Sequence, residues 1–342
     1  MRRAAALPAA TVGGEAIRAE VVGIPADAGE AEAGPRTRGT WADLRAAVAE
    51  QERTPFRAGR LELTALRRAL QKLGAPATSI AVALANIPVC VPPCAPRDTQ
   101  RSALPSPELA KALRSAVECE LLVPALRTGV VCSHHFVTPK RDLSWRLISD
   151  LREVNVFLDP ERFRLVQLRK LPGSVKKYMA SADLTKAFWQ LPVDPASQHL
   201  LGVEFDDQTL VYQGLPMGLS ISPLILQRIT DAICAGMRSQ GIWIVGYLDD
   251  FLLSADTEQE LLHACDVFVE FCRDAGLRIS GEKSEFSSNT ELEFLGIIVN
   301  PTAQTFSVPP ARLERITNHR RPHGCYGLHA HAWLRFNGSW GV

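Results

Sequence analysis

Apolar residues recur at two different spacings from about residue 106 onward, and these spacings predict a mixture of helices and strands. Helical spacing predicts helices over residues 106–122 and 222–236, and a third one that includes Leu261 to Cys272. Short apolar runs predict strands over residues 130–140, 144–151, 178–184, 200–205, 209–213, 242–254 and 292–300. Short turns separate the first two of these strands and also the fourth and fifth, so we expect two antiparallel hairpins. The pattern as a whole indicates an α+β domain.

Capping residues mark the ends of the predicted helices. Ser106 is a residue type that caps helices, and Pro107 fits a first turn. Ser222 and Pro223 open the second helix, which we expect to end at Gly236. The third helix is expected to stop near Gly276.

The first third of the chain has a different composition. Residues 1–105 are rich in Ala, Arg, Pro and Gly, and leucines recur at helical spacing only locally, as over residues 61–73. Prolines interrupt residues 87–107 and block helix there, which is typical of a linker. We therefore expect a low-order N-terminal region and linker over 1–105, a folded domain over 106–310, and an irregular tail over 311–342.

Composition and charge leave a nucleic-acid partner open. The chain has 342 residues, 46% of them hydrophobic, and a formal net charge of +1, so it is globular and weakly charged overall. The small net charge of the whole chain conceals a basic cluster. Between Arg127 and Lys177 there are 11 basic residues and only 5 acidic ones. Clustered cations can bind phosphates.

The spacing of the cysteines and the lengths of the apolar runs indicate in which cellular compartment the protein is expected. The 8 cysteines are scattered without a paired zinc spacing, and the one close pair, Cys90 and Cys94, has no second pair of ligands near it. Reduced thiols are the simpler interpretation. No apolar run reaches the roughly 18 residues of a membrane span, and the first 20 residues lack the apolar stretch of a secretory signal. We expect an intracellular protein of the cytoplasm or nucleus that is not secreted and does not bind membranes.

Two adjacent acids, Asp249 and Asp250, interrupt an apolar strand run. Buried carboxylates need a partner or a cation, so a metal is one explanation, and a hairpin turn with solvated acids is the other. Asp183 repeats the situation at the end of another apolar strand, and two such strand ends could converge. Asp206 and Asp207 lie in a polar turn and are expected to be solvated surface residues.

Magnesium prefers hard oxygen ligands, commonly one or two carboxylates together with substrate phosphates. Two such ions about 4 Å apart can activate a hydroxyl and stabilise the transition state and leaving group of phosphoryl transfer. Convergent acids at strand ends therefore favour a polymerase-type site.

The sequence Tyr247-Leu248-Asp249-Asp250 resembles the YxDD box of reverse transcriptases, and other motifs of that family occur in order around it. They are PKRDLSWRLISDLREVN (139–155), SADLTKAFWQL (181–191), QGLPMGLSISP (213–223), GLRISGEKSEF (276–286) and LEFLGI (292–297). The resemblance covers roughly residues 110–310. It implies the fingers and palm of a right-hand polymerase with an antiparallel palm sheet, and a thumb that is truncated or absent.

The resemblance implies roles for the acidic residues. Asp183 and Asp249 match the family's ligands for two Mg²⁺ ions, for which Mn²⁺ can substitute. Asp250 matches the neighbouring acid that supports the site, and Lys283 matches a lysine near the pyrophosphate that is a candidate proton donor. All four are therefore candidate catalytic residues.

The resemblance also implies substrate contacts. Lys140 and Arg146 match fingers residues that contact the incoming triphosphate and base, as a point charge and a planar donor. Phe188 falls where the family carries an aromatic ring that excludes a ribose 2′ hydroxyl. It could also be an ordinary core phenylalanine.

The segment from Gln213 to Gly218 resembles the loop behind the nucleotide and template, where a glycine permits close approach of backbones. Met217 departs from the Gln of retroviral enzymes and is similar to hepadnaviral and DIRS-type sequences. The sub-family, gypsy-type elements included, stays open on this basis.

The resemblance implies a retrotransposon enzyme, an RNA-directed DNA polymerase, that uses deoxynucleoside triphosphates and an RNA or DNA template with its primer. Template binding would rest on phosphate and 2′ hydroxyl contacts and weaken as salt rises. The alternatives are an inactive remnant that binds nucleic acid and a polymerase that makes RNA, which Phe188 disfavours. We expect only a beginning of a thumb near residues 311–316, and no oligomeric state is indicated.

Overall fold

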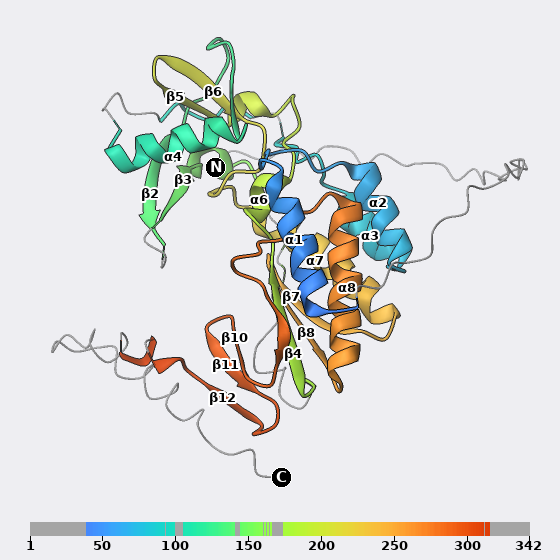
Figure 1. The fold of residues 1–342 in the computed structure, drawn as a ribbon. Coiled ribbons are helices and arrows are strands. Elements are labelled where there is room, and N and C mark those ends of the chain that lie inside the picture. Colours follow the sequence, from blue (N-terminus) through green and yellow to red (C-terminus); the bar gives the residue numbers. More distant parts are fainter. Residues whose placement is uncertain are drawn as a thin grey trace, which may run out of the picture. The chain divides into compact units, whose positions relative to one another are not determined.

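Helices and antiparallel strands alternate along the chain (Figure 1). The computed structural model describes residues 39–92, 94–99, 105–140, 144–159, 161, 163, 165, 174–310 and 312–314. Within them all the strands that form sheets pair antiparallel with their neighbours. The predicted α+β class is confirmed.

The longer helices are α1 (Trp41–Arg53), α2 (Leu63–Lys72), α3 (Ala77–Leu84), α4 (Pro107–Glu118), α7 (Ser222–Ser239) and α8 (Glu258–Ala275). The short ones are α5 (Arg152–Asn155), α6 (Ala187–Gln190) and the 3-10 turn η2 (Gln198–Leu200). The strands before residue 240 are β1 (Leu122–Pro124), β2 (His134–Pro139), β3 (Trp145–Asp150), β4 (Tyr178–Asp183), β5 (Gly202–Phe205) and β6 (Gln208–Tyr212). Those after it are β7 (Trp243–Tyr247), β8 (Asp250–Ala255), β9 (Glu285–Asn289), β10 (Leu292–Phe294), β11 (Ile297–Asn300) and β12 (Thr305–Ser307).

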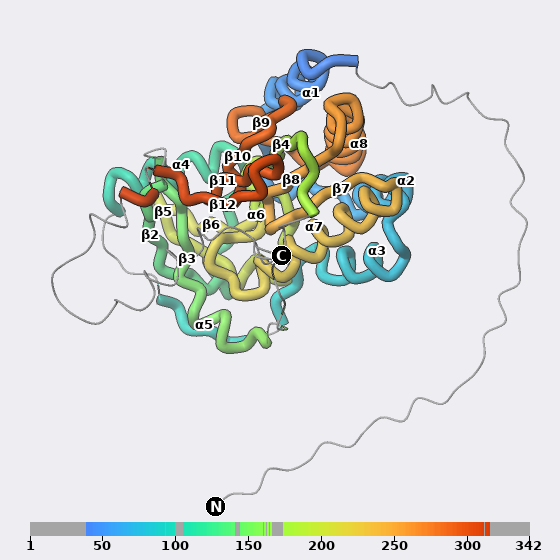
Figure 2. Tube along the Cα trace, turned by 90° about the horizontal axis from the view of Figure 1, so that it is seen from below, coloured from blue at the N-terminus to red at the C-terminus, as the bar shows by residue number. Residues whose placement is uncertain are grey.

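A four-stranded sheet in the order β7-β8-β4-β9 is the centre of the structure. Figures 1 and 2 show α7 and α8 on one side of this sheet and the small β10-β11-β12 sheet on the other. On the helical side, the ring of Phe268 in α8 lies 4.9 Å from that of Phe251 in β8. Such a ring pair contributes about 1 kcal/mol beyond the apolar area that it buries.

Alternation along the strands divides the side chains between two cores. Side chains of successive strand residues point to opposite faces. Ala182 in β4 and Phe251 in β8 therefore join the large core under the helices, whereas Met179 and Leu252 join a smaller core against β10 and β11. By the same alternation, Asp183 and Asp250 lie on the face that carries Met179 and Leu252.

The predicted hairpins before residue 240 are confirmed. Strand β2 pairs with β3, and β5 pairs with β6 in a sheet of order β1-β6-β5. Asp206 and Asp207 form the turn between β5 and β6, where both have positive φ angles of 48° and 57°. Both are exposed, which fits the expectation of solvated turn residues.

The predicted helix ends are confirmed in two cases and wrong in one. The Ser106 hydroxyl accepts a hydrogen bond from the N–H of Leu109, and Gly276 ends α8 with a left-handed φ of 75°. Helix α7 continues past Gly236 to Ser239. That glycine serves close packing instead, because a Cβ atom there would lie 2.9 Å from the side chain of Leu73.

Residues 41–91, which the composition predicts to have little order, are folded. Helices α1 and α2 contact α8, and α3 contacts α7 (Figure 1). Leu44, Leu66 and Leu70 are fully buried in the large core. The proline-rich stretch also begins inside the fold, since Val89 is buried and forms a bridge with Val193. Apolar side chains at helical spacing outweigh the abundance of Ala and Arg in this region.

Some expectations fall on residues that the structure does not describe. These are residues 1–38, most of the predicted tail after residue 310, and the basic residues Arg141, Arg162, Arg164, Arg169 and Lys170. Among the described residues, no helix has the length and apolar character needed to cross a membrane. The cysteines in the described ranges are all free thiols.

A buried histidine in β2 predicts an acid-sensitive step in stability. His135 is 3% exposed, its Nδ1 lies 2.8 Å from the carbonyl oxygen of Ser133, and its ring stacks on Tyr212. The Nδ1–H therefore donates to that carbonyl. The other nitrogen, Nε2, is buried without a hydrogen-bond partner among the described residues. Burial, with a smaller effect of neighbouring His134, lowers the pKa of His135 from 6.5 to about 4.

We expect the protein to lose stability as the pH falls from about 6.5 towards 4. Above this window His135 is neutral in both states, but within it only the unfolded chain binds the proton. By pH 4.5 the free energy of unfolding should fall by roughly 2–3 kcal/mol on this account. His135→Phe should lack this part of the loss in urea unfolding at pH 7 and pH 4.5. Equal losses in the two proteins would contradict the assignment.

Candidate active site

The two predicted strand-end acids lie side by side on the central sheet. Asp183, the last residue of β4, is paired directly with Asp250, the first residue of β8. Directly opposed residues have Cβ atoms about 5 Å apart and point to the same face. Asp183 is 8% exposed. The convergence expected from the sequence is thus present.

Asp249 lies in the turn between β7 and β8. Tyr247 pairs with Asp250, so Leu248 and Asp249 are the two residues of a tight hairpin turn. Leu248 has a φ of 56°, a conformation that costs a bulky side chain energy and is often found at functional sites. The hairpin turn that was one explanation of the Asp pair is present, but its acids are partly buried and converge with Asp183.

Two side chains of helix α7 form hydrogen bonds with the backbone of this turn. The side-chain oxygen of Gln227 accepts a hydrogen bond from the N–H of Leu248 at 2.9 Å, and the Thr230 hydroxyl donates to the carbonyl of Leu248 at 2.5 Å. Gln227 and Thr230 are both buried. On the other side, the N–H of Leu184 donates to the carbonyl of Asp249 at 3.0 Å. The strained turn is therefore fixed by three hydrogen bonds.

All three carboxyl groups have raised pKa values, and burial is the main cause for each of them. Burial raises the pKa of Asp183, and the charge of Asp249 adds to the effect. Burial also raises the pKa of Asp249. For Asp250, burial and the charges of the other two acids raise the pKa to about 7. Like charges gathered in a partly buried place favour either a proton or a cation.

Lys283 supplies one nearby positive charge. Its Nζ lies 3.4 Å from the Asp183 carboxylate, and its side chain is 59% exposed. Because the lysine side chain is mostly in solvent, this long ion pair contributes little to stability. The backbone of Asp183 is bound more firmly, since its N–H donates to the Ser284 hydroxyl at 3.0 Å and its carbonyl accepts from the N–H of Ser280 at 2.8 Å.

The chemistry of these donors fits a hard divalent cation. Asp183 and Asp249 offer carboxylate oxygens, and burial raises the pKa values of both. No group of three or more His, Cys, Asp or Glu side chains in the described ranges is arranged as a complete metal site. A polymerase-type ion needs fewer protein ligands, because phosphate oxygens and water complete its coordination.

Helix α6 carries Phe188 just beyond β4. Phe188 is half-buried and packs against the large core. Gln213 lies on a neighbouring segment, since its carbonyl accepts from the N–H of Val193, and Gly214 forms a bridge with Pro192. The structure therefore brings the predicted Phe188 and Gln213 segments together.

The end of the 213–218 loop is clamped to the β2–β3 region. The carbonyl of Met217 accepts from the N–H of Ser149, and the Asn155 amide group binds the carbonyl of Gly218 and the N–H of Ser220. Gly218 has a φ of 123°, and a Cβ atom there would lie 2.0 Å from the carbonyl oxygen of Ser149. A glycine is required by this close approach.

The two cationic residues that the resemblance assigns to the fingers, Lys140 and Arg146, lie on the β2–β3 hairpin. Lys140 follows β2, and Arg146 in β3 pairs with Thr138. Both side chains are exposed. The positive charge of Arg146 lies close enough to Asp249 to lower its pKa against the effect of burial. Arg146 is thus near Asp249.

Several of the other basic residues expected to meet phosphates are paired internally. Arg127 forms ion pairs with Asp98 and Glu204, and Arg152 pairs with Asp150. Such exposed pairs are weak and can exchange partners.

Gln227, Thr230, Ser280 and Ser284 were not singled out from the sequence. The sequence signal that could have indicated their role is that Gln227 and Thr230 are polar residues in a helix whose buried residues are mostly apolar. Their partners are backbone groups about 20 residues or more away, which no local spacing could have indicated.

Comparison with known proteins identifies the domain. Residues 138–299 match the family model described as "Reverse transcriptase (RNA-dependent DNA polymerase)". Protein P of heron hepatitis B virus is 36% identical over 159 residues, which cover 44% of this chain and 20% of that protein. The Pro-Pol polyprotein of simian foamy virus type 1 is 29% identical over 163 residues, or 47% of this chain and 14% of that protein. The chain thus matches about a fifth or less of these relatives' length.

Solved structures of a foamy viral protease-reverse transcriptase have a similar fold. One in complex with double-stranded DNA superposes with a TM-score of 0.59 at 19% identity, covering 80% of this chain and 61% of that one. Another, in complex with an RNA/DNA hybrid, has a TM-score of 0.57 at 22% identity and covers 69% and 31%. At these identities the likeness concerns the fold. The chain therefore contains a reverse transcriptase domain of retroelement or hepadnavirus-like type, built on the fingers and palm of a polymerase.

Proposed function

We propose that this chain is an RNA-directed DNA polymerase that adds deoxynucleotides to a primer on an RNA or DNA template. The observation that carries the proposal is the convergence of Asp183, Asp249 and Asp250 at one end of the palm sheet. It lies within a segment that matches the reverse transcriptase family. The proposed setting is a retrotransposable element.

Asp183 and Asp249 are the proposed ligands of two Mg²⁺ ions, and Asp250 supports them. When bound, such ions lower the pKa of the primer 3′ hydroxyl and neutralise charge on the transferred and leaving phosphates. The carboxylates alone would repel a triphosphate, so their role is to concentrate the negative charge that draws the cations in. Asp250, with its pKa near 7, can balance this charge by holding a proton.

The cationic residues have complementary roles in the proposal. Arg146 and Lys140 bind the incoming triphosphate from the fingers side. Lys283, whose Nζ lies 3.4 Å from the Asp183 carboxylate, is proposed to hold a proton near the leaving pyrophosphate. Deoxynucleoside triphosphates are the proposed substrates because Phe188, on α6 next to the Gln213 segment, would occupy the space of a 2′ hydroxyl.

The first test is magnesium-dependent incorporation of deoxynucleotides on primed poly-rA, comparing wild type with Asp249→Asn. A metal ligand contributes several kcal/mol to the transition state, so we expect incorporation to fall at least about a hundredfold. The matched control is Asp207→Asn, an identical chemical change in the exposed β5–β6 turn. It should leave incorporation unchanged.

Either of two outcomes would defeat the proposal. One is equal incorporation by the wild type and Asp249→Asn. The other is a folded wild-type chain that binds primed template and incorporates nothing, which would favour a catalytically inactive remnant that binds nucleic acid.

The role of Phe188 predicts a change in sugar discrimination. Phe188→Ala should raise incorporation of ribonucleotides relative to deoxynucleotides by about tenfold or more, because steric exclusion is lost. Phe306→Ala is the control, since Phe306 is also half-buried but packs in the smaller core against β10 and β11. Single-nucleotide incorporation with dTTP and UTP measures the ratio. An unchanged ratio in Phe188→Ala would make Phe188 a core residue only.

A further inference from the structure

The end of α1 and the chain that follows it, residues 51–61, contact two segments next to the proposed active site. One is residues 278–281, which lead to Lys283, and the other is α6, which carries Phe188. The N-terminal segment 51–61 lies outside the residues matched by the reverse transcriptase family. Its contacts are nevertheless directed at that domain.

The first set of contacts joins the end of α1 to residues 278–281. The Arg278 guanidinium donates to the carbonyls of Gln51 and Thr54. Side-chain oxygens of Gln51 and Glu52 accept from the N–H groups of Ile279 and Gly281, at 3.3 and 2.8 Å. The last carbonyls of a helix lack partners within the helix and carry partial negative charge, so a guanidinium there is doubly favoured.

Residues 278–281 in turn hold the backbone around Asp183. The carbonyl of Arg278 accepts from the N–H of Thr185, and the N–H of Ser280 donates to the carbonyl of Asp183. Leu184 and Ile279 form a bridge. The backbone of Asp183 and of the two residues that follow it is therefore bound to the segment that α1 supports.

The second set of contacts joins residues 56–61 to α6. The N–H groups of Gly59 and Leu61 donate to the carbonyls of Trp189 and Gln190, at 2.7 and 3.2 Å. The ring of Phe56 lies beneath Lys186 at 5.1 Å and Arg278 at 6.0 Å. Cations over an aromatic face are attracted to it.

Gln190 closes the network between these two segments. Its buried side chain donates to the carbonyls of Thr185 and Arg278 and accepts from the N–H of Arg278. Movement of residues 278–281 would therefore be transmitted to α6 as well as to Asp183.

We propose that residues 51–61 are a positioning segment of the polymerase site. Through Arg278 they set the position of the loop that carries Lys283 and binds Asp183, and through α6 they set the position of Phe188. This inference rests on the proposed function. Small displacements of reacting groups have large effects on rate, so the segment matters for catalysis without contacting the substrate.

Arg278→Met tests the segment, because it keeps much of the side-chain stem and removes the guanidinium. We expect the single-nucleotide incorporation rate at saturating substrate to fall about tenfold or more, with a smaller change in KM. Discrimination between dTTP and UTP should weaken in the same variant, because α6 shifts. Arg278→Lys, which retains a donor, should recover part of both.

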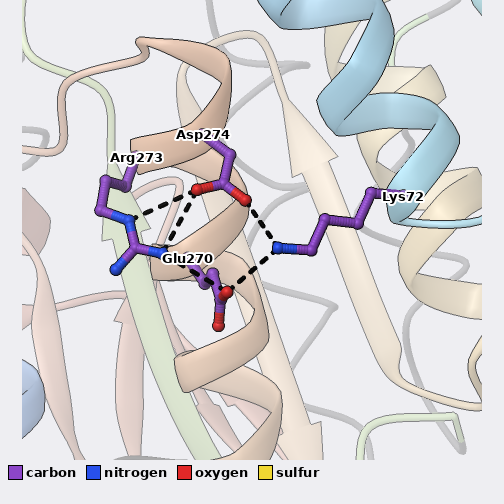
Figure 3. Close-up of polar contacts among 4 residues, drawn as sticks. All are labelled: Lys72, Glu270, Arg273 and Asp274. Carbon is purple, nitrogen blue, oxygen red and sulfur yellow. Dashed lines mark hydrogen bonds and ion pairs between the residues drawn. The ribbon is translucent and has the colours of Figure 1, made fainter. Parts of the chain in front are cut away.

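Lys72→Met is the matched control. Lys72 in α2 forms ion pairs with Glu270 and Asp274 of α8, which also contact Arg273 (Figure 3). The pairs attach the N-terminal helices to the same domain and have no described contact with the site. Lys72→Met should therefore lower stability without changing the rate or the discrimination more than about twofold. Equal effects of the two variants would overturn the positioning role.

Hydrogen exchange of the full chain separates this inference from the proposed function. Arg278→Met should speed exchange of the Ser280 and Asp183 amides about tenfold relative to Lys72→Met, even if the wild-type chain is inactive. An inactive wild type would defeat the proposed function alone, whereas unchanged exchange at these amides would defeat the positioning segment. If Arg278→Met does not fold, Glu52→Ala replaces it, because it removes only the acceptor for Gly281 and should still speed exchange of that amide.

Discussion

Three carboxylates held together in a partly buried place are the constraint around which this domain is organised. Burial raises the pKa of each acid, the charge of Asp249 adds to the effect on the other two, and the positive charges of Lys283 and Arg146 are among the effects that oppose it. Without a rigid framework, the repulsion between these carboxylates would move them apart. The cluster persists because Asp183 ends a central strand and the turn bearing Asp249 is fixed by Gln227 and Thr230. The framework thus holds the charges in position before a cation or substrate arrives, which is the condition for electrostatic catalysis.

The two cores explain why the framework can resist this repulsion. Helices α7 and α8 bury one face of the sheet, and the β10–β12 sheet buries the apolar part of the other. Because side chains alternate along β4 and β8, one face carries both the smaller core and the acids. A shift of β4 or of β8 by one residue would turn the acid of the shifted strand, Asp183 or Asp250, into the large core. Register is therefore maintained by the same alternation that exposes the site.

The sequence predicted the elements that have strong local signals. Ser106 and Gly276 marked helix ends because capping depends on neighbouring residues, and the acids at 183 and 249–250 were noticed because they interrupt apolar runs. The helix end predicted at Gly236 was wrong. From the sequence, a glycine that ends a helix cannot be told apart from one that allows a side chain such as Leu73 to pack closely. Gln227, Ser284 and Arg278 could not be assigned roles, since their partners are backbone groups distant along the chain. The order of residues 41–91 was missed because alanine-rich helices there depend on packing against α7 and α8.

That packing shows how far the folded domain extends toward the N-terminus. The family match begins at residue 138, but Leu44, Leu66 and Leu70 are fully buried in the same core as Ile233 and Phe268. A chain starting at 138 would expose the faces of α7 and α8 that these leucines cover, at a cost of roughly 2 kcal/mol for each large side chain uncovered. Those two helices also hold the Asp249 turn and the palm sheet. The physical unit that supports the carboxylates therefore extends back at least to α1, well before the residues that match the reverse transcriptase family.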